Sequence, residues 1–250
     1  MTKMDSLDVV AFAAHPEDVE LSCGGTIALL AALGYRVLLV DLTKGELGTN
    51  GSPDLRAQEA SAAAQRLNVI GRQNLGLPDG GINSHDPRQL SSVVTCLRET
   101  KPRVVFVPYW EERHPDHVEA SHLITRAAFF SNVGGYQTVA HNVRHDVKQI
   151  IYYQMRTEFA PSFIVDISGH VSTKMEAIKC FGSQVASGAS ESNQATLLNS
   201  ARSLSAIEAR DGHFGAMIGV AFGEAFYVRN ALSVSDPVAF FNTESRPLFY

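Results

Sequence analysis

The chain has 250 residues, of which 45% are hydrophobic, and its formal net charge at pH 7 is -5. This length and hydrophobic content suffice to bury one large core, so we expect residues 1–250 to form a single domain. Lysine and arginine are scattered along the chain, which argues against nucleic acid and anionic membranes as partners. The expected partner is therefore a small molecule.

Two further patterns concern the compartment. The acidic start of the chain lacks the basic segment, long apolar stretch and cleavage site of a signal peptide, and no stretch approaches the roughly 20 apolar residues of a membrane helix. The three cysteines are far apart and form no C-x-x-C pair, so neither a disulfide framework nor a cysteine zinc site is indicated. We expect a cytoplasmic protein.

Apolar runs and helix-like stretches alternate along the first half of the chain. Strands are predicted at residues 7–13, 36–41 and 103–108, and helices at residues 25–33, 53–67 and 87–99. Ser52-Pro53 and Asp86-Pro87 are typical helix starts, with a capping side chain before a proline. The alternation predicts an α/β fold: a Rossmann-like, mostly parallel sheet with helices on both faces.

The pattern is looser after about residue 131. Strands are predicted at residues 149–154 and 162–167, and a helix at residues 168–181. We expect this C-terminal half to form a cap over the site.

The first predicted strand runs directly into Ala14-His15-Pro16-Glu17-Asp18. Ligands of open α/β sheets bind at the carboxyl ends of strands. The spacing of His15 and Asp18 lets one tight turn direct both side chains to one point, and zinc accepts both imidazole nitrogen and carboxylate oxygen.

A second cluster, Arg113-His114-Pro115-Asp116-His117, follows the strand predicted at residues 103–108. A single loop histidine is more often a surface or hydrogen-bonded residue than a ligand, but two such clusters at strand ends favour a metal site. One ligand from this cluster, for which we choose His117, completes three ligands and leaves a position for water, as in catalytic zinc sites.

Both clusters resemble the paired signatures of the LmbE-like, or PIG-L, deacetylase family. The resemblance covers most of the chain and includes Gly45-Glu46-Leu47-Gly48-Thr49, Arg56 with Glu59, Arg210-Asp211 and Phe222-Gly223-Glu224-Ala225-Phe226. It is strongest to the branch that acts on N-acetylglucosaminyl-malate in bacillithiol biosynthesis. It implies a Zn²⁺-dependent N-deacetylase that releases acetate and a free amino sugar.

The resemblance also implies roles for individual residues. His15, Asp18 and His117 would bind zinc, Glu17 would be the general base, His114 would assist by stabilising the oxyanion, and Asp116 would orient His114. The family usually has Asp where this chain has Glu17. A carboxylate displaced by one methylene can lower the rate by about 100-fold, unless the backbone adjusts.

Three residues are predicted to bind the substrate. Arg56 and Arg113 could each read a carboxylate of a malate aglycone through a guanidinium fork. The alternatives are a helical ion pair of Arg56 with Glu59, and for Arg113 a surface position or pairing with Glu111 or Glu112. Gln184 resembles a family position that faces the substrate.

Several alternatives stay open from the sequence. The substrate could be another N-acetylglucosamine conjugate or a chito-oligosaccharide, and the protein could be a non-catalytic, zinc-containing sugar-binding protein. A site of two histidines and one carboxylate also accepts iron and other divalent ions. Relatives resembling this chain form homo-oligomers, often hexamers, and the apolar residues 237–241 could serve such a contact.

Overall fold

The computed structural model describes residues 6–138, 143–185 and 203–241. Seven strands form one sheet in the order β3-β2-β1-β4-β5-β7-β6 within these residues. The strands are β1 (Val9–Ala13), β2 (Val37–Asp41), β3 (Gly71–Asn74), β4 (Val104–Pro108), β5 (Gln149–Tyr153), β6 (Phe163–Asp166) and β7 (Gly223–Tyr227). The first five strands in this order are parallel, whereas β7 is antiparallel to both β5 and β6. The predicted mostly parallel sheet is confirmed.

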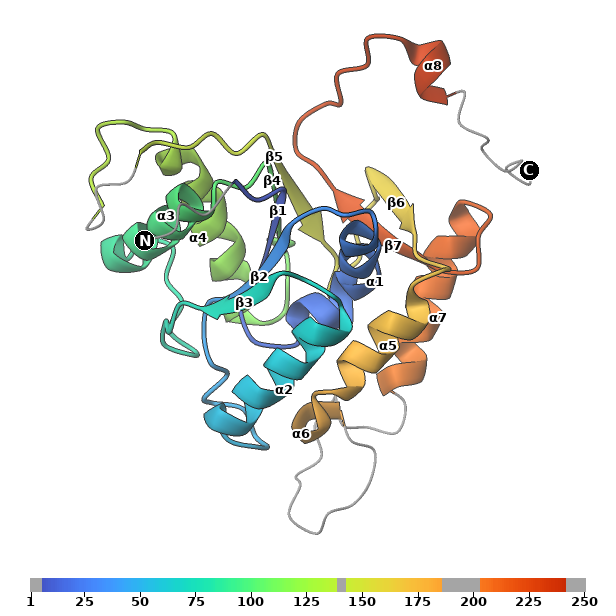
Figure 1. The fold of residues 1–250 in the computed structure, drawn as a ribbon, viewed down its shortest axis with the longest axis horizontal. Coiled ribbons are helices and arrows are strands. Elements are labelled where there is room, and N and C mark those ends of the chain that lie inside the picture. Colours follow the sequence, from blue (N-terminus) through green and yellow to red (C-terminus); the bar gives the residue numbers. More distant parts are fainter. Residues whose placement is uncertain (1–5, 139–142, 186–202, 242–250) are drawn as a thin grey trace.

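Helices lie on both faces of the sheet, as Figure 1 shows. They are α1 (Asp18–Ala32), α2 (Pro53–Arg66), α3 (Pro87–Thr100), α4 (Pro115–Ser131), α5 (Val171–Lys179), α6 (Gly182–Val185), α7 (Ser203–Met217) and α8 (Pro237–Phe241). Val10 and Phe12 of β1 pack with α3 and α4, while Val9 and Ala11 pack with α1, α2 and α5. Because successive strand residues point to opposite faces, β1 needs apolar residues throughout, and all five of them are buried.

The strand order positions the site. β1 pairs with β2 on one side and with β4 on the other, although β4 follows β3 in the chain. The connections after β1 and β4 therefore leave toward opposite faces, which opens a crevice at the carboxyl ends of these two strands. Both histidine clusters of the sequence follow these ends.

Helix α1 begins earlier than residue 25, where the sequence predicted its start, and it is kinked. Cys23 has non-helical φ and ψ angles of −136° and 21°. At the kink, Arg210 donates to the carbonyl of Leu21 (2.6 Å), and Glu224 accepts from the amides of Gly25 (2.9 Å) and Thr26 (2.7 Å). Side chains of α7 and β7 thus satisfy the backbone groups that the kink releases.

A buried ion network joins these elements. Lys174 of α5 donates to Asp211 (2.6 Å) and to Glu224 (2.7 Å), and all three side chains are at most 1% exposed. The sequence predicted a cap for the half after residue 131, whereas this half adds β5, β6 and β7 to the same sheet. Through Glu224 the ion network also supports α1, the helix that carries Asp18. It reaches the loops on the site side through α6, where Gln184 donates to the carbonyl of Asn50 (2.8 Å).

The chain leaves β7 as an extended arm that ends in the short helix α8 (Figure 1). Val238 and Phe240 on this helix are exposed, as are Leu232 and Val234 before it. In the part of the chain that the structure describes, no helix combines the length and apolar character needed to cross a bilayer.

Candidate active site

The two predicted clusters meet at the carboxyl ends of β1 and β4. His15 follows β1, Asp18 begins α1, and His117 lies in the first turn of α4. The imidazole centroids of His15, His114 and His117 lie 4.8 to 5.3 Å from one another. A proline follows His114 and occupies the first position of α4. This helix start places His117 in the first turn of the helix.

Asp18 lies between two imidazoles. Its Oδ2 is 3.5 Å from Nδ1 of His15, and its Oδ1 is 3.4 Å from Nε2 of His117. The backbone amide of His15 also donates to Oδ2 (2.8 Å), which holds the carboxylate in the turn. The three residues predicted as ligands are thus brought together from two distant parts of the chain.

Each imidazole also has a carboxylate on its other side. Nε2 of His15 lies 3.1 Å from Asp79 Oδ1 and 3.3 Å from Asp116 Oδ2. Nδ1 of His117 lies 3.9 Å from Glu112 Oε2. The sequence had not singled out Asp79 or Glu112 as partners of the histidines, and these contacts depend entirely on how the loops pack.

This arrangement favours positive charge. Burial opposes protonation of His15, yet Asp116, Asp18 and Asp79 hold its pKa well above its ordinary value. Burial likewise opposes protonation of His117, but Asp18 and then Glu112 raise its pKa to about 9. Despite its burial, Asp18 has a lowered pKa because both imidazoles lie beside it.

The donor set fits a divalent cation. Both ring nitrogens of His15 and of His117 face carboxylates, but a neutral imidazole carries only one N–H. The second nitrogen of each neutral ring would therefore direct a lone pair at a carboxylate, unless a cation lies between the ring and that carboxylate. A proton or a metal ion supplies that charge, and Asp18 is the carboxylate common to both rings. Nitrogen and oxygen ligands of this kind suit zinc. Among the described residues, two groups of three have ligand atoms that all lie within 4.8 Å of one another: His15 with His114 and His117, and His15 with Asp79 and Asp116. Asp18 belongs to neither group, and its place in the predicted ligand set rests on its own contacts with His15 and His117.

Glu17 stands at the edge of this cluster in an unusual backbone conformation. Its φ and ψ angles are 92° and −23°, in the left-handed region that glycine favours, and it precedes α1. Its side chain is 7% exposed and lies 3.5 Å from Nη1 of Arg56. Burial raises the pKa of Glu17 to about 8, although Arg56 opposes the shift. A buried carboxyl with this pKa can hold and release a proton near neutral pH.

Arg56 belongs to α2, and its guanidinium packs closely against Gly45 and Gly48. A Cβ on Gly45 or on Gly48 would overlap the guanidinium nitrogens of Arg56, and Gly45 has a φ of +66°. Glu59, the alternative partner considered from the sequence, instead accepts from the amide (2.7 Å) and hydroxyl (2.6 Å) of Ser183. The structure therefore pairs Arg56 with Glu17.

Asp116, for which the resemblance implied the role of orienting His114, contacts that residue through its backbone amide. Its amide donates to Nδ1 of His114 (3.2 Å), while its carboxylate accepts from the amide of Gly80 (2.7 Å) and contacts His15. Burial, followed by the charges of His117 and His15, lowers the pKa of His114. A neutral His114 that accepts at Nδ1 carries its proton on Nε2 and can donate there.

The residues predicted to bind substrate lie apart from one another. The side chain of Arg113 is exposed at the rim, and its amide donates to Glu112 (3.1 Å). Gln184 is buried, and its amide nitrogen donates to Asn50 and to the hydroxyl of Ser183 (3.0 Å). Substrate contacts of Arg113 and Gln184 stay predictions.

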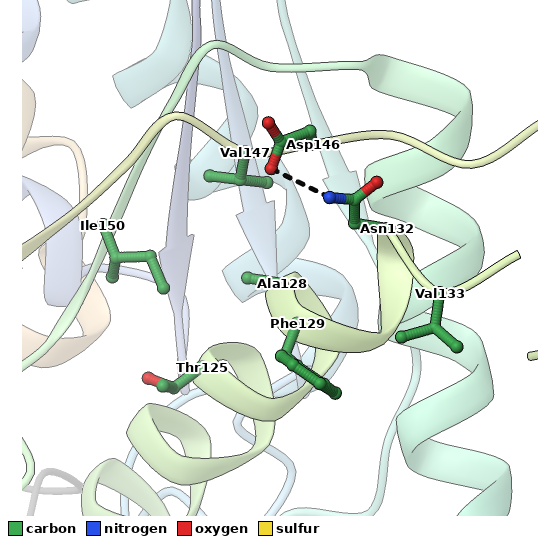
Figure 2. Close-up of a pocket in the computed structure, with 8 residues that line it drawn as sticks. All are labelled: Thr125, Ala128, Phe129, Asn132, Val133, Asp146, Val147 and Ile150. Atoms are coloured by element: carbon green, nitrogen blue, oxygen red, sulfur yellow. Dashed lines mark hydrogen bonds between the residues drawn. The ribbon is translucent and has the colours of Figure 1, made fainter.

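A separate hollow lies toward the other end of α4. It has a volume of about 320 Å³ and is shown in Figure 2, where Asn132 donates to Asp146. Thr125, which lines it, is more than two helical turns beyond His117. This hollow is not part of the histidine cluster.

The stretch of chain that carries both histidine clusters matches a known family. Residues 10–129 match the family described as "PIG-L: GlcNAc-PI de-N-acetylase". A 1D-myo-inositol 2-acetamido-2-deoxy-alpha-D-glucopyranoside deacetylase from Acidothermus cellulolyticus is 34% identical over 46% of this chain and 50% of its own length. The chain spans about half the length of the curated relatives of this name that it matches.

Solved structures match over almost the whole chain. The conserved protein TT1542 from Thermus thermophilus is 33% identical, with a TM-score of 0.82, and the match covers 92% of this chain and 98% of that one. The N,N'-diacetylchitobiose deacetylase from Pyrococcus horikoshii has a TM-score of 0.75 over 90% of this chain and 84% of that one. At its 24% identity the likeness shows the fold.

Proposed function

Residues 10–129 of the chain are a PIG-L family domain, and from this premise we propose that the protein hydrolyses the N-acetyl group of an N-acetylglucosamine conjugate. The observation that carries the proposal is the position of Glu17: a buried carboxyl next to Asp18, which contacts the two imidazoles. An acid–base group beside a cation site is the arrangement that amide hydrolysis needs.

We propose zinc as the ion, with His15, Asp18 and His117 as its ligands. A zinc ion held there supplies polarisation of the acetyl carbonyl and a water molecule of lowered pKa. Support comes from the donor set and from the two imidazoles that each face carboxylates on both sides.

Glu17 moves the protons in this proposal. As general base it takes a proton from the attacking water while a C–O bond forms at the acetyl carbon. As general acid it then gives that proton to the departing sugar nitrogen as the C–N bond breaks. Arg56, 3.5 Å away, opposes the effect of burial and so lets the carboxylate form exist. The products are acetate and a free amine.

His114 is the proposed oxyanion donor. Because the amide of Asp116 donates to its Nδ1, the neutral ring has its proton on Nε2. A well-placed neutral donor of this kind stabilises a tetrahedral oxyanion by about 3 to 4 kcal/mol.

The substrate specificity depends further on the aglycone, the group attached to N-acetylglucosamine. The family resemblance favours malate, and an exposed Arg113 at the rim supports an anionic aglycone. The names of several curated relatives instead include inositol, which has no carboxylate. We propose the malate conjugate as substrate, in a cytoplasmic and homo-oligomeric enzyme of the bacillithiol pathway.

The experiment strips the protein with a chelator, adds back stoichiometric zinc, and follows release of free amine. The substrates are N-acetylglucosaminyl-malate, its inositol counterpart, diacetylchitobiose and free N-acetylglucosamine. Zinc-restored turnover with a large preference for malate supports the whole proposal, and a preference for inositol or chitobiose keeps the deacetylase and rejects the aglycone. Zinc binding without turnover on any of the four would favour a non-catalytic sugar-binding protein.

A further inference from the structure

Glu112 is a buried acidic residue in the loop between β4 and α4. Its side chain is 2% exposed, whereas the neighbouring Glu111 is exposed. Burial opposes its ionisation, but His117 and backbone amides lower its pKa to about 2. From the sequence, Glu112 was considered only as a possible partner of Arg113, and the hydrolysis proposed above does not use it.

Three backbone amides hold this carboxylate in place. Oε1 accepts from the amides of Arg156 (2.8 Å) and Thr157 (2.5 Å), and Oε2 accepts from the amide of Arg113 (3.1 Å). The first two amides belong to the loop after β5, and the third belongs to the loop that leads into α4. Glu112 therefore joins two loops at the same edge of the sheet, and the carboxylate has little freedom to move.

The fixed carboxylate faces His117. Oε2 lies 3.9 Å from Nδ1 of His117, a nitrogen that is buried and has no hydrogen-bond partner among the described residues. The other ring nitrogen, Nε2, lies 3.4 Å from Asp18. Leaving a buried ring nitrogen unsatisfied is unfavourable, so Glu112 is the acceptor that an Nδ1 proton would use.

We propose that Glu112 is a positioning residue for His117: it accepts the Nδ1 proton of the imidazole and thereby leaves the Nε2 lone pair facing the cation site beside Asp18. The inference rests on the proposed function in taking His117 as a metal ligand. A carboxylate behind a ligating histidine fixes the tautomer and ring orientation and makes the ligand more basic.

Glu112→Gln tests the proposal and keeps two of the three backbone contacts, since an NH₂ group in place of Oε2 cannot accept from the amide of Arg113. The amide oxygen of glutamine can still accept from Arg156 and Thr157, so the connection between the loops is kept. Its NH₂ group replaces the oxygen that faces His117 and favours the opposite tautomer, with the proton on Nε2. Glu111→Gln is the matched control, because it removes the same charge one residue away at an exposed position.

Zinc affinity, measured by competition with a chromophoric chelator and without substrate, is the first readout. We expect Glu112→Gln to bind zinc about 10- to 100-fold more weakly, and Glu111→Gln to bind it like the wild type. Equal affinities for Glu112→Gln and the wild type would overturn the proposal. Melting temperatures of the metal-free proteins show whether both variants fold.

The histidine tautomer is the second readout and needs no variant. Side-chain ¹⁵N shifts of the zinc-loaded wild type should show His117 protonated at Nδ1 and not at Nε2. A proton on Nε2 would reject the inference even if Glu112→Gln failed to fold. Neither readout uses substrate, so a protein that holds zinc through Glu112 and His117 but hydrolyses no N-acetyl sugar would reject the proposed function and keep this inference.

Discussion

The carboxylate of Glu17 and the guanidinium of Arg56 lie 3.5 Å apart, and their side chains are only 7% and 5% exposed. One residue precedes α1 and the other belongs to α2, so the pair spans the loop that follows β2. The proposed base therefore has its compensating charge on a different helix. This separation makes the proposed role of Arg56 testable without touching a zinc ligand.

Arg56→Met should lower kcat by about 100-fold. Without the guanidinium, Glu17 loses the positive charge that opposes burial, so a larger fraction of Glu17 stays protonated, and its position is less fixed. Steady-state kinetics on zinc-loaded protein measures the effect. Arg66→Met, on the same helix with a side chain 63% exposed, is the control and should keep wild-type kcat. An Arg56→Met enzyme with normal kcat would remove Arg56 from the mechanism.

Two substitutions of Glu17 should differ strongly. Glu17→Gln removes the acid–base group and should lower kcat by about 100- to 10,000-fold while zinc affinity is kept. Glu17→Asp restores the residue usual in the family and places a residue that tolerates the left-handed region at φ 92°, so it should stay within about 10-fold of wild type. Turnover and zinc binding are measured on both variants. A Glu17→Gln enzyme with near-wild-type kcat would mean that Glu17 is needed for shape rather than for proton transfer, because glutamine keeps the shape and lacks the acid–base group.

Gly45→Ala should impair the enzyme beyond its effect on the backbone. The new Cβ would overlap Arg56, in addition to the strain that alanine meets at φ +66°. Gly34→Ala is a matched control, because Gly34 has φ +86° and no atom within 4 Å of an added Cβ. Both variants should lose stability in urea unfolding, by about 1 kcal/mol or more. Only Gly45→Ala should also lose activity. Equal activities of the two variants would show that the close contact of Gly45 with Arg56 is not needed for catalysis.

Lys174→Met should destabilise the fold by about 3 to 5 kcal/mol. The substitution leaves the buried carboxylates of Asp211 and Glu224 without the ammonium that both contact. Lys179→Met, in the last turn of the same helix and exposed, should change the unfolding free energy by less than about 0.5 kcal/mol. Chemical denaturation at neutral pH measures both. A Lys174→Met protein as stable as the control would mean that the network adjusts to the loss.

Acid titration should reveal the lowered pKa of Glu112. A glutamate whose pKa falls to about 2 on folding contributes stability that is full above its unfolded pKa near 4.5 and is lost as pH falls through 2. Metal-free wild type should therefore lose more unfolding free energy between pH 4.5 and 2 than Glu112→Gln, by at most about 1.4 kcal/mol per pH unit. Parallel curves for wild type and Glu112→Gln would contradict the lowered pKa.

Local patterns were sufficient for the strands β1, β2 and β4 and for the helices α2, α3 and α5, whereas the long helices α4 and α7 were not predicted. The apolar runs predicted at residues 7–13, 36–41 and 103–108 contain β1, β2 and β4, and the prolines after Ser52 and Asp86 begin α2 and α3. These elements depend on short-range periodicity and capping, which neighbouring residues express directly. The strand β3 was not predicted, because Gly71–Asn74 is short and polar and takes its strand form from pairing with β2.

The start of α1 shows the same division. The predicted helix at residues 25–33 matches the part after the kink at Cys23, whereas Asp18–Ser22 was missed. Arg210 donates to Leu21 in that first segment, and Glu224 accepts from the amides just after the kink; both partners lie almost 200 residues away in the chain. No local pattern near residue 18 could reveal those partners.

By itself, the sequence predicted the residues of a cation site, since two short His/Asp clusters directly follow two strands, and the carboxyl ends of parallel strands lie at one edge of a sheet. Only the tertiary structure decided which groups lie around them: Asp79 and Asp116 on His15, Glu112 on His117, and Arg56 on Glu17. The reason is physical. Clusters within five residues are fixed by the turn that carries them, whereas contacts between loops depend on strand order and on the packing of distant helices.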